Sequence, residues 1–307
     1  MNIDPALLQS AAAAAAGAQQ YPAGALYVVA TPIGNLADLT LRAIHVLGLV
    51  DAVACEDTRV SAVLLRHLGL DKPLIALHRH NEAQASALLL QRLQQGQRVA
   101  VVSDAGTPAV SDPGALLVAR VAAAGCRVLP VPGASSALAA LSVAGDAADG
   151  SGGFAFVGFL PAGGAARSAA LQRLAQAAAA QVLFEAPHRI DKLARELAEA
   201  MPQRRLTLCR ELTKQFETVH TLAAAELPAW LAADAQRQRG EFVLVLHALP
   251  AAAAEEDGLP PAAQRTLGLL LRELPLKQAV SLAAELGAGP RNALYQAALQ
   301  MQATTPK

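Results

Sequence analysis

The fold is decided by residues Ser103 to Gly114, which read SDAGTPAVSDPG. They follow the apolar run 98–102, RVAVV, which is typical of a buried strand, and they precede a helical pattern at 115–124. A strand, a polar Gly/Pro loop and a helix in this order present backbone N–H groups at the strand's carboxyl end. Such loops usually have about 2–6 residues, so this longer one predicts a ligand-binding loop.

Strands alternate with helices on both sides of this loop, which predicts a mostly parallel, doubly wound sheet. Polar clusters follow the predicted strands, where open α/β sheets bind ligands. Beyond residue 153 the strands are fewer and the helices longer, which predicts a second α/β domain, partly antiparallel. The predicted strands are 25–30, 52–55, 73–77, 98–102, 127–131, 154–161, 181–185, 206–209 and 240–246.

Changes in composition divide the chain into four predicted parts, with linkers at 146–153 and 250–258. The tail, with breaks at Pro275 and at 289–290, resembles a small helix-turn-helix, and a helical brace is the alternative. The predicted parts are a flexible N-terminal extension (1–24), an N-terminal α/β domain (25–147), a C-terminal α/β domain (154–249) and a helical C-terminal module (259–307).

The composition excludes several classes of protein. The 307 residues include 25 basic and 25 acidic ones, so a polyanion would have to bind a local patch. The three cysteines lack CxxC spacing, so neither a disulfide framework nor a metal site is predicted. The uncharged runs 10–36 and 128–145 contain proline and glycine and are not expected to span a membrane. We therefore expect a cytoplasmic protein.

Several stretches together resemble the tetrapyrrole methylase superfamily of S-adenosylmethionine-dependent enzymes. Within it they are similar to the bacterial branch that methylates the ribose 2′-hydroxyl of cytidine 1402 in 16S ribosomal RNA. The resemblance implies two α/β domains of class III methyltransferase type, with the cofactor cleft between them. The matching stretches are 26–36 (LYVVATPIGNL), 56–59 (EDTR), 103–114, 132–136 (PGASS), 158–161 (GFLP), 187–189 (PHR), 210–214 (RELTK) and 240–241 (GE).

The resemblance also implies the cofactor, S-adenosylmethionine, and its contacts. The residues expected to bind it are Pro32, Asp104, Ala105, Gly106, Thr107, Val110, Ser135, Ser136, Glu185, Leu212 and Gly240. A ribose hydroxyl is a poor nucleophile, so a nearby base is expected to help. The residue types and motifs leave the base unassigned among Glu56, Asp57, His80, His188 and Glu211.

The basic residues inside the motifs are expected to contact RNA phosphates, with salt bridges to neighbouring carboxylates as the alternative. They are Arg59, Arg189, Arg210 and Lys214, joined by His80. The implied partner is 16S rRNA in the small ribosomal subunit, and members of the superfamily are typically homodimers.

Two other functions stay open at this point. One is a tetrapyrrole C-methyltransferase, which would bind an anionic macrocycle, and the other is a noncatalytic nucleotide-binding module. A nicotinamide-dependent dehydrogenase is disfavoured because no GxGxxG follows the first strand.

Overall fold

The computed structural model describes residues 4–146, 153–249, 259 and 261–304. They divide into two compact units: residues up to 146 together with 153–248, and the C-terminal helices. Most of the predicted linker at 146–153, and all of the one at 250–258, lies outside the described residues. Within the described residues, no helix has the length and apolar character needed to cross a bilayer.

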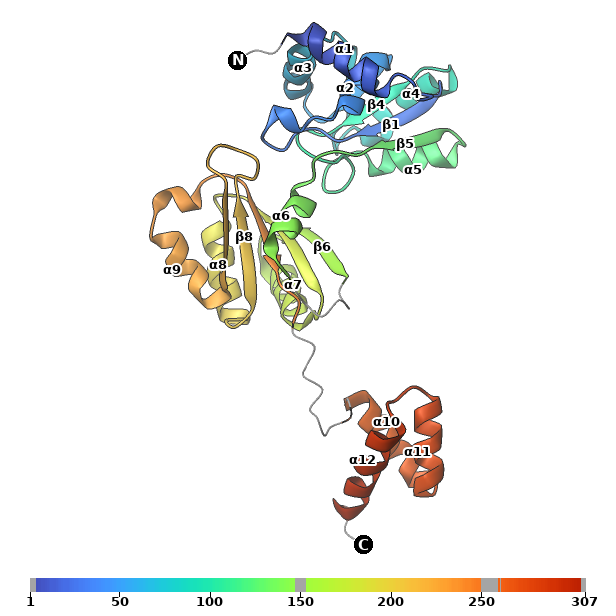
Figure 1. Cartoon of the computed structure of the whole chain (residues 1–307), viewed down its shortest axis with the longest axis vertical. Coiled ribbons are helices and arrows are strands. Elements are labelled where there is room, and N and C mark those ends of the chain that lie inside the picture. Colours follow the sequence, from blue (N-terminus) through green and yellow to red (C-terminus); the bar gives the residue numbers. More distant parts are fainter. Residues whose placement is uncertain (1–3, 147–152, 250–258, 260, 305–307) are drawn as a thin grey trace. The chain divides into compact units, whose positions relative to one another are not determined.

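The first sheet is parallel throughout, with the order β3-β2-β4-β1-β5 (Figure 1). Its strands are Ala25–Val29 (β1), Ala52–Cys55 (β2), Leu74–Ala76 (β3), Val99–Val102 (β4) and Arg127–Val131 (β5). Because β1 pairs directly with β4, the loops that follow these two strands start side by side. This edge is where the site described below lies.

Alternating side chains of the first sheet form two separate cores. Tyr27 and Val53 face α2 and α3 on one side, whereas Leu26 and Val101 face α4 and α5 on the other. The helices are Leu41–Leu49 (α2), Thr58–His67 (α3), Glu82–Gln94 (α4) and Ala115–Ala123 (α5). Burial on both faces explains the continuous apolar character of these strands.

The described part of the N-terminal extension contains a helix. Pro5–Ala16 forms a helix, α1, which is capped by Asp4 and packs against α2. Ala12 and Ala16 are buried, and Gln9 Nε2 donates to the Leu68 carbonyl at 2.7 Å. Alanine has the highest helix propensity, and its small side chain allows close packing against α2.

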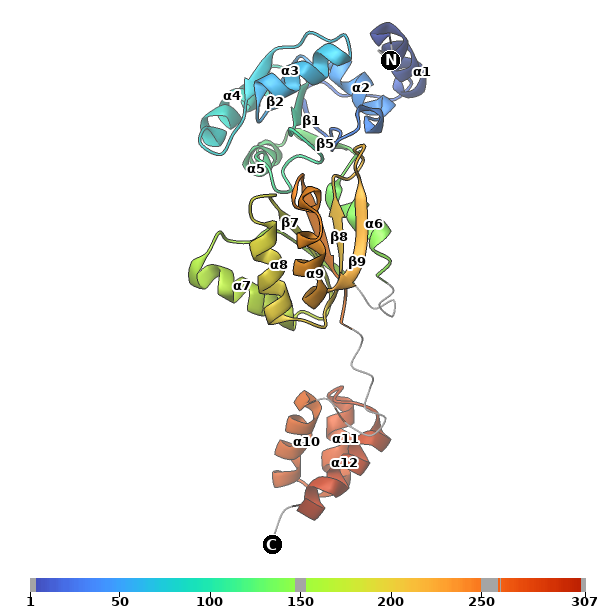
Figure 2. The same cartoon turned by 90° about the vertical axis from the view of Figure 1, so that its left-hand side faces the viewer.

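The second sheet has the order β6-β7-β10-β8-β9, in which only the β6–β7 pair is parallel. The expectation of partly antiparallel pairing is confirmed, although β9 was not predicted. The strands are Phe154–Phe159 (β6), Ala180–Glu185 (β7), Arg205–Arg210 (β8), Thr218–Ala223 (β9) and Phe242–Leu246 (β10). Figure 2 shows this sheet with α7, α8 and α9 on one side and α6 on the other. These helices are Ser136–Ala144 (α6), Gly164–Gln176 (α7), Ile190–Ala200 (α8) and Leu227–Ala232 (α9).

The second unit is a three-helix module with its own core. Its helices are Pro261–Glu273 (α10), Leu276–Glu285 (α11) and Arg291–Thr304 (α12). Leu267, Val280 and Leu294 are buried against one another. The predicted breaks at Pro275 and 289–290 therefore fall between helices, and the predicted fold class of two α/β sheets plus a C-terminal helical module is confirmed.

The buried His247, which follows β10, contacts Thr207 in β8 and Asp146, which precedes β6 in the chain. His247 Nε2 lies 2.8 Å from Thr207 Oγ1, and its Nδ1 lies 3.6 Å from Asp146 Oδ1. Burial lowers the pKa of His247, although the Asp146 charge opposes this effect. Protonation of the imidazole is therefore disfavoured in the folded protein.

We expect the free energy of unfolding to fall as the pH drops below about 6.5, the ordinary histidine pKa, because protonation is disfavoured in the folded state. Denaturant unfolding between pH 8 and 5 checks this. In His247→Gln, which keeps a polar side chain, this part of the pH dependence is expected to disappear. An unchanged pH dependence would contradict the assignment.

Candidate functional site

The loop 103–114 is fixed to the loop after β1 by a backbone bridge. Thr31 N donates to the Gly106 carbonyl at 2.9 Å, and Gly106 N donates to the Thr31 carbonyl at 3.1 Å. Gly106 has φ +83°, which side-chain-bearing residues rarely adopt. The hydroxyl of Ser103 donates to the same Gly106 carbonyl at 3.0 Å. This end of the loop is therefore rigid.

The far end of the same loop is held by α4. Glu82 Oε1 accepts hydrogen bonds from Gly114 N at 2.9 Å and Leu116 N at 3.1 Å, which satisfies free N–H groups at the start of α5. In the middle of the loop, Thr107 Oγ1 donates to the Ala134 carbonyl at 3.2 Å. Glu82 and Ala134 thus hold this loop from two different segments of the chain.

The second sheet contributes a strained turn, 211–214. Glu211 and Thr213 have φ of 52° and 65°. The turn packs against two glycines: a Cβ on Gly34 would lie 2.5 Å from Lys214 Cγ, and one on Gly240 would lie 2.5 Å from Glu211 Cγ. Both positions therefore require glycine, and Gly34 allows the loop after β1 to contact the second sheet.

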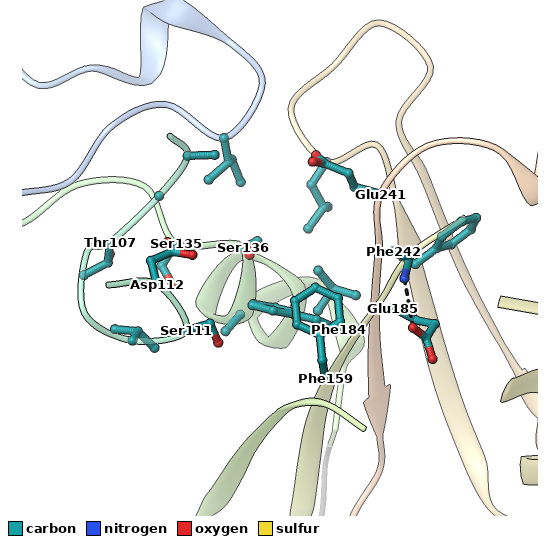
Figure 3. A pocket seen from close by; sticks show the side chains of 18 of the residues that line it. Thr107, Ser111, Asp112, Ser135, Ser136, Phe159, Phe184, Glu185, Glu241 and Phe242 are labelled. Carbon is teal, nitrogen blue, oxygen red and sulfur yellow. Dashed lines mark hydrogen bonds between the residues drawn. The ribbon is translucent and has the colours of Figure 1, made fainter. Parts of the chain in front are cut away.

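These loops enclose a cavity of about 350 Å³ within the first unit. Thr107, Ser111 and Asp112 form one wall, facing Phe159 and Phe184 (Figure 3). The lining residues are Ile33, Ala105, Gly106, Thr107, Val110, Ser111, Asp112, Ser135, Ser136, Ala137, Phe159, Phe184, Glu185, Ala186, Pro187, Leu212, Glu241, Phe242 and Val243. Apolar walls with a few hydroxyl and carboxylate groups are typical of a small-molecule site.

Eight of the residues predicted to bind the cofactor line this cavity, and three do not. Those that line it are Ala105, Gly106, Thr107, Val110, Ser135, Ser136, Glu185 and Leu212. Pro32, Asp104 and Gly240 are next to lining residues instead, and Asp104 accepts a hydrogen bond from Asp57 N at 3.1 Å. Cofactor binding by any of these residues stays a prediction.

The candidate bases differ in their surroundings, and none of them lines the cavity. Burial and the charges of Asp112 and Asp104 raise the pKa of Glu56. Asp57 caps α3, and its hydrogen bonds with Arg59 lower its pKa to about 2. A carboxylate with so low a pKa is a weak proton acceptor.

The other candidates for the base are ion-paired or exposed. Glu211 Oε1 accepts from Lys214 Nζ and from Glu241 N, both at 2.9 Å, and these bonds lower its pKa against the opposing effect of burial. His188 and His80 have exposed side chains. The surroundings of these residues therefore do not single out one of them as the proton acceptor.

Arg210 conflicts with its expected role as a phosphate contact. It is 9% exposed, and its guanidinium donates to the carbonyls of Arg239 at 2.8 Å and Phe216 at 2.8 Å. The guanidinium of Arg210 is therefore occupied by hydrogen bonds to backbone carbonyls. We leave Arg210 out of the proposed RNA surface.

The buried Glu185, which lines the cavity, pairs with the half-buried Arg189. Arg189 Nε lies 3.0 Å from Glu185 Oε1, and Arg189 Nη2 donates to the Leu160 carbonyl at 2.7 Å. The buried Arg167 lies 3.7 Å from the other Glu185 oxygen and donates to the Pro161 carbonyl. These charges fix the GFLP segment, which carries Phe159.

Two predicted cations remain near the surface. Lys214 pairs with Glu211 at 2.9 Å and with Glu241 at 2.8 Å, whereas Arg59 pairs with Asp57 and its side chain is 89% exposed. No group of three or more His, Cys, Asp or Glu residues suited to a metal occurs in the described part of the chain.

Sequence reasoning missed several residues that line the cavity. Phe159 and Glu241 belong to motifs that were recognised, GFLP and GE, but their own side chains were not singled out. Ile33 follows the predicted Pro32 directly. Phe184 and Phe242 gave no signal, because apolar residues in a strand are read as core.

The fold and site define a class of protein. The model of the tetrapyrrole (corrin/porphyrin) methylases matches residues 25–228, and that of the RsmI C-terminal HTH domain matches 257–302. The chain belongs to the tetrapyrrole methylase family and is a methyltransferase, which confirms the resemblance found in the motifs.

The comparisons also identify a particular group within this family. The ribosomal RNA small subunit methyltransferase I of Escherichia coli O157:H7 is 47% identical over 280 residues, which cover 91% of this chain and 96% of that protein. The protein of the same name from Neisseria meningitidis serogroup B is 48% identical, with coverages of 90% and 93%.

Solved structures agree on the fold. Cobalt precorrin-4 methyltransferase, a cobalamin biosynthetic enzyme, superposes with a TM-score of 0.56 at 18% identity, covering 74% of this chain and 98% of its own. Diphthine synthase gives 0.55 at 16% identity, with coverages of 73% and 90%.

We expect Gly106→Val to weaken binding of S-adenosylmethionine at least tenfold in a folded protein, measured by calorimetry. A Cβ at Gly106 would lie 3.3 Å from Ile33 Cγ2, which lines the cavity, and the bridge to Thr31 would be strained. Gly96→Val is the matched control, since Gly96 also has φ +83° but no atom within 4 Å of an added Cβ. Equal affinities in the two variants would refute the role of this loop.

Proposed function

We propose that this chain transfers a methyl group from S-adenosylmethionine to the 2′-hydroxyl of a cytidine ribose, at position 1402 of 16S rRNA in the small ribosomal subunit. The carrying observation is the 47% identity over 91% of the chain to a protein named ribosomal RNA small subunit methyltransferase I. We also propose that the protein acts in the cytoplasm.

The cavity suits the proposed cofactor. Its volume of about 350 Å³ is in the range of ligand pockets, and its walls combine apolar and hydroxyl groups. Phe159, Phe184 and Leu212 would contact the apolar parts, and the hydroxyls of Ser135, Ser136 and Thr107 would bind the polar ends. When bound, S-adenosylmethionine supplies an electrophilic methyl group.

The chain's own residues then act mainly by positioning and by excluding water. Methyl transfer needs the acceptor oxygen, the methyl carbon and the sulfur in line, so rigid walls contribute much of the rate. The bridge between Thr31 and Gly106 fixes one wall, and the pair of Arg189 with Glu185 fixes the other. The aromatic side chains exclude water from the reacting atoms.

We propose that exposed basic side chains hold the RNA. Arg59 is the best candidate because its side chain is 89% exposed, and His80 is exposed as well. Lys214 and Arg189 are weaker ones, since each would have to leave a carboxylate partner. Cationic side chains position RNA through its phosphates without reading bases.

The remaining proposals concern assembly. We propose a homodimer, supported by exposed apolar side chains on α6 and β6, namely Leu138, Val143, Phe154 and Val157. We also propose that residues 25–147 and 154–249 form two α/β domains and that residues 259–307 form a helical module.

Incubation with labelled cofactor and small ribosomal subunits from cells lacking the modification tests the function. We expect label on one cytidine ribose, found by nuclease digestion and mapping. Label on a base, on protein or on an added tetrapyrrole would contradict the proposed reaction.

Arg59→Ala is expected to weaken RNA binding at any sequence and to reduce the salt dependence by about one unit of log–log slope. Cofactor affinity is expected to stay unchanged, because Arg59 does not line the cavity. The control is Arg195→Ala, which removes an exposed arginine paired with Asp191 on α8. A slope equal to the control's would exclude Arg59 from the RNA surface.

A further inference from the structure

Three carboxylates line the cavity, and two of them are neutralised by cations. Glu185 pairs with Arg189 at 3.0 Å, and its side chain is fully buried. Glu241 pairs with Lys214 at 2.8 Å. For the third, Asp112, no ion pair occurs within the described residues. A proton acceptor needs a free lone pair that faces the substrate, and Asp112 meets this condition best.

Asp112 belongs to the fixed loop and lies on the wall that faces Phe159 and Phe184 (Figure 3). Half-burial raises the pKa of Asp112, and the negative charge of Asp104 raises it further. The charge of Arg79 and the polar hydroxyl of Ser103 lower this pKa and so act in the opposite direction. The negative charge of Asp112 in turn raises the pKa of Glu56, after burial as the larger cause.

Arg79 has a defined place beside this carboxylate. Its Nη2 donates to the carbonyl of Ser111 at 3.3 Å, and Ser111 lines the cavity. Its positive charge lowers the pKa values of both Asp112 and Glu56. Arg79 therefore lowers the basicity of the Asp112 carboxylate.

We propose that Asp112 is the catalytic base, which accepts the proton of the attacking hydroxyl, and that Arg79 is a positioning residue for it. The inference rests on the proposed function. In the step, the ribose 2′-oxygen bonds to the methyl carbon, and the carbon–sulfur bond breaks with its electron pair staying on sulfur. The hydroxyl proton passes to an Asp112 carboxylate oxygen.

The test compares Asp112→Asn with the wild-type protein in single-turnover methylation of small subunits from pH 5 to 9. The amide has nearly the same shape and cannot accept the proton. We expect the rate to fall about 10²–10⁴-fold. The loss of rate toward low pH is expected to vanish, while affinity for S-adenosylmethionine by calorimetry stays within about threefold of wild type.

Two further variants make the test specific. Asp191→Asn, at an exposed site on α8, is the matched control and is expected to behave as wild type. Arg79→Gln is expected to shift the acid limb of the pH profile to higher pH, because the positive charge that lowers the pKa of Asp112 is gone. A merely structural role of Arg79 would not move that limb.

The outcomes separate this inference from the proposed function. Near-wild-type rates in Asp112→Asn, or a tenfold loss of cofactor affinity, would overturn the role of Asp112 as base. A flat pH profile in Glu56→Gln but not in Asp112→Asn would overturn it in favour of Glu56. No labelled ribose with the wild-type protein would overturn the proposed function, and this inference with it.

Discussion

The backbone bridge between Thr31 and Gly106 is the contact on which the site depends. The pairing of β1 with β4 brings the loops after these strands together, and the two hydrogen bonds of the bridge join them. Ile33 and the segment 105–112 consequently form one continuous wall of the cavity. The bridge needs a residue that tolerates φ +83°, which ties a glycine in the sequence to the shape of the cavity.

The opposite wall depends on buried charge rather than on backbone pairing. Arg167 and Arg189 donate to the carbonyls of Pro161 and Leu160 and surround Glu185. Removing one partner of such a network leaves an uncompensated buried charge, which typically costs about 3–5 kcal/mol. The network is therefore best understood as a clamp that keeps Phe159 in place. A phosphate could bind Arg189 only if the bonds of Arg189 to Glu185 and to the Leu160 carbonyl were broken.

Much of the fold could be predicted from the sequence, because both faces of β1, β2 and β4 are buried and their apolar runs are unambiguous. The strand β9 escaped prediction, since its residues, TVHTLA, are only partly buried and mix polar with apolar types. The Ala/Gln run that contains α1 shows no amphipathic pattern, so the sequence did not fix the bounds of this helix. Arg210 donates to the carbonyl of Arg239, which is distant in the sequence, and the spacing of motifs cannot predict such a contact.

Most of the basic residues in the motifs are paired inside the protein, in keeping with its zero net charge. Lys214 and Arg189 are paired with carboxylates, and Arg210 is bonded to carbonyls, so their charges are largely balanced inside the protein. A phosphate could recruit them only by breaking those bonds, at a cost that would cancel much of the Coulombic gain. Strong attraction to any RNA is thereby avoided. Under the proposed function, selection of one nucleotide would therefore rely on the shape of the RNA, with the exposed Arg59 as a candidate phosphate contact.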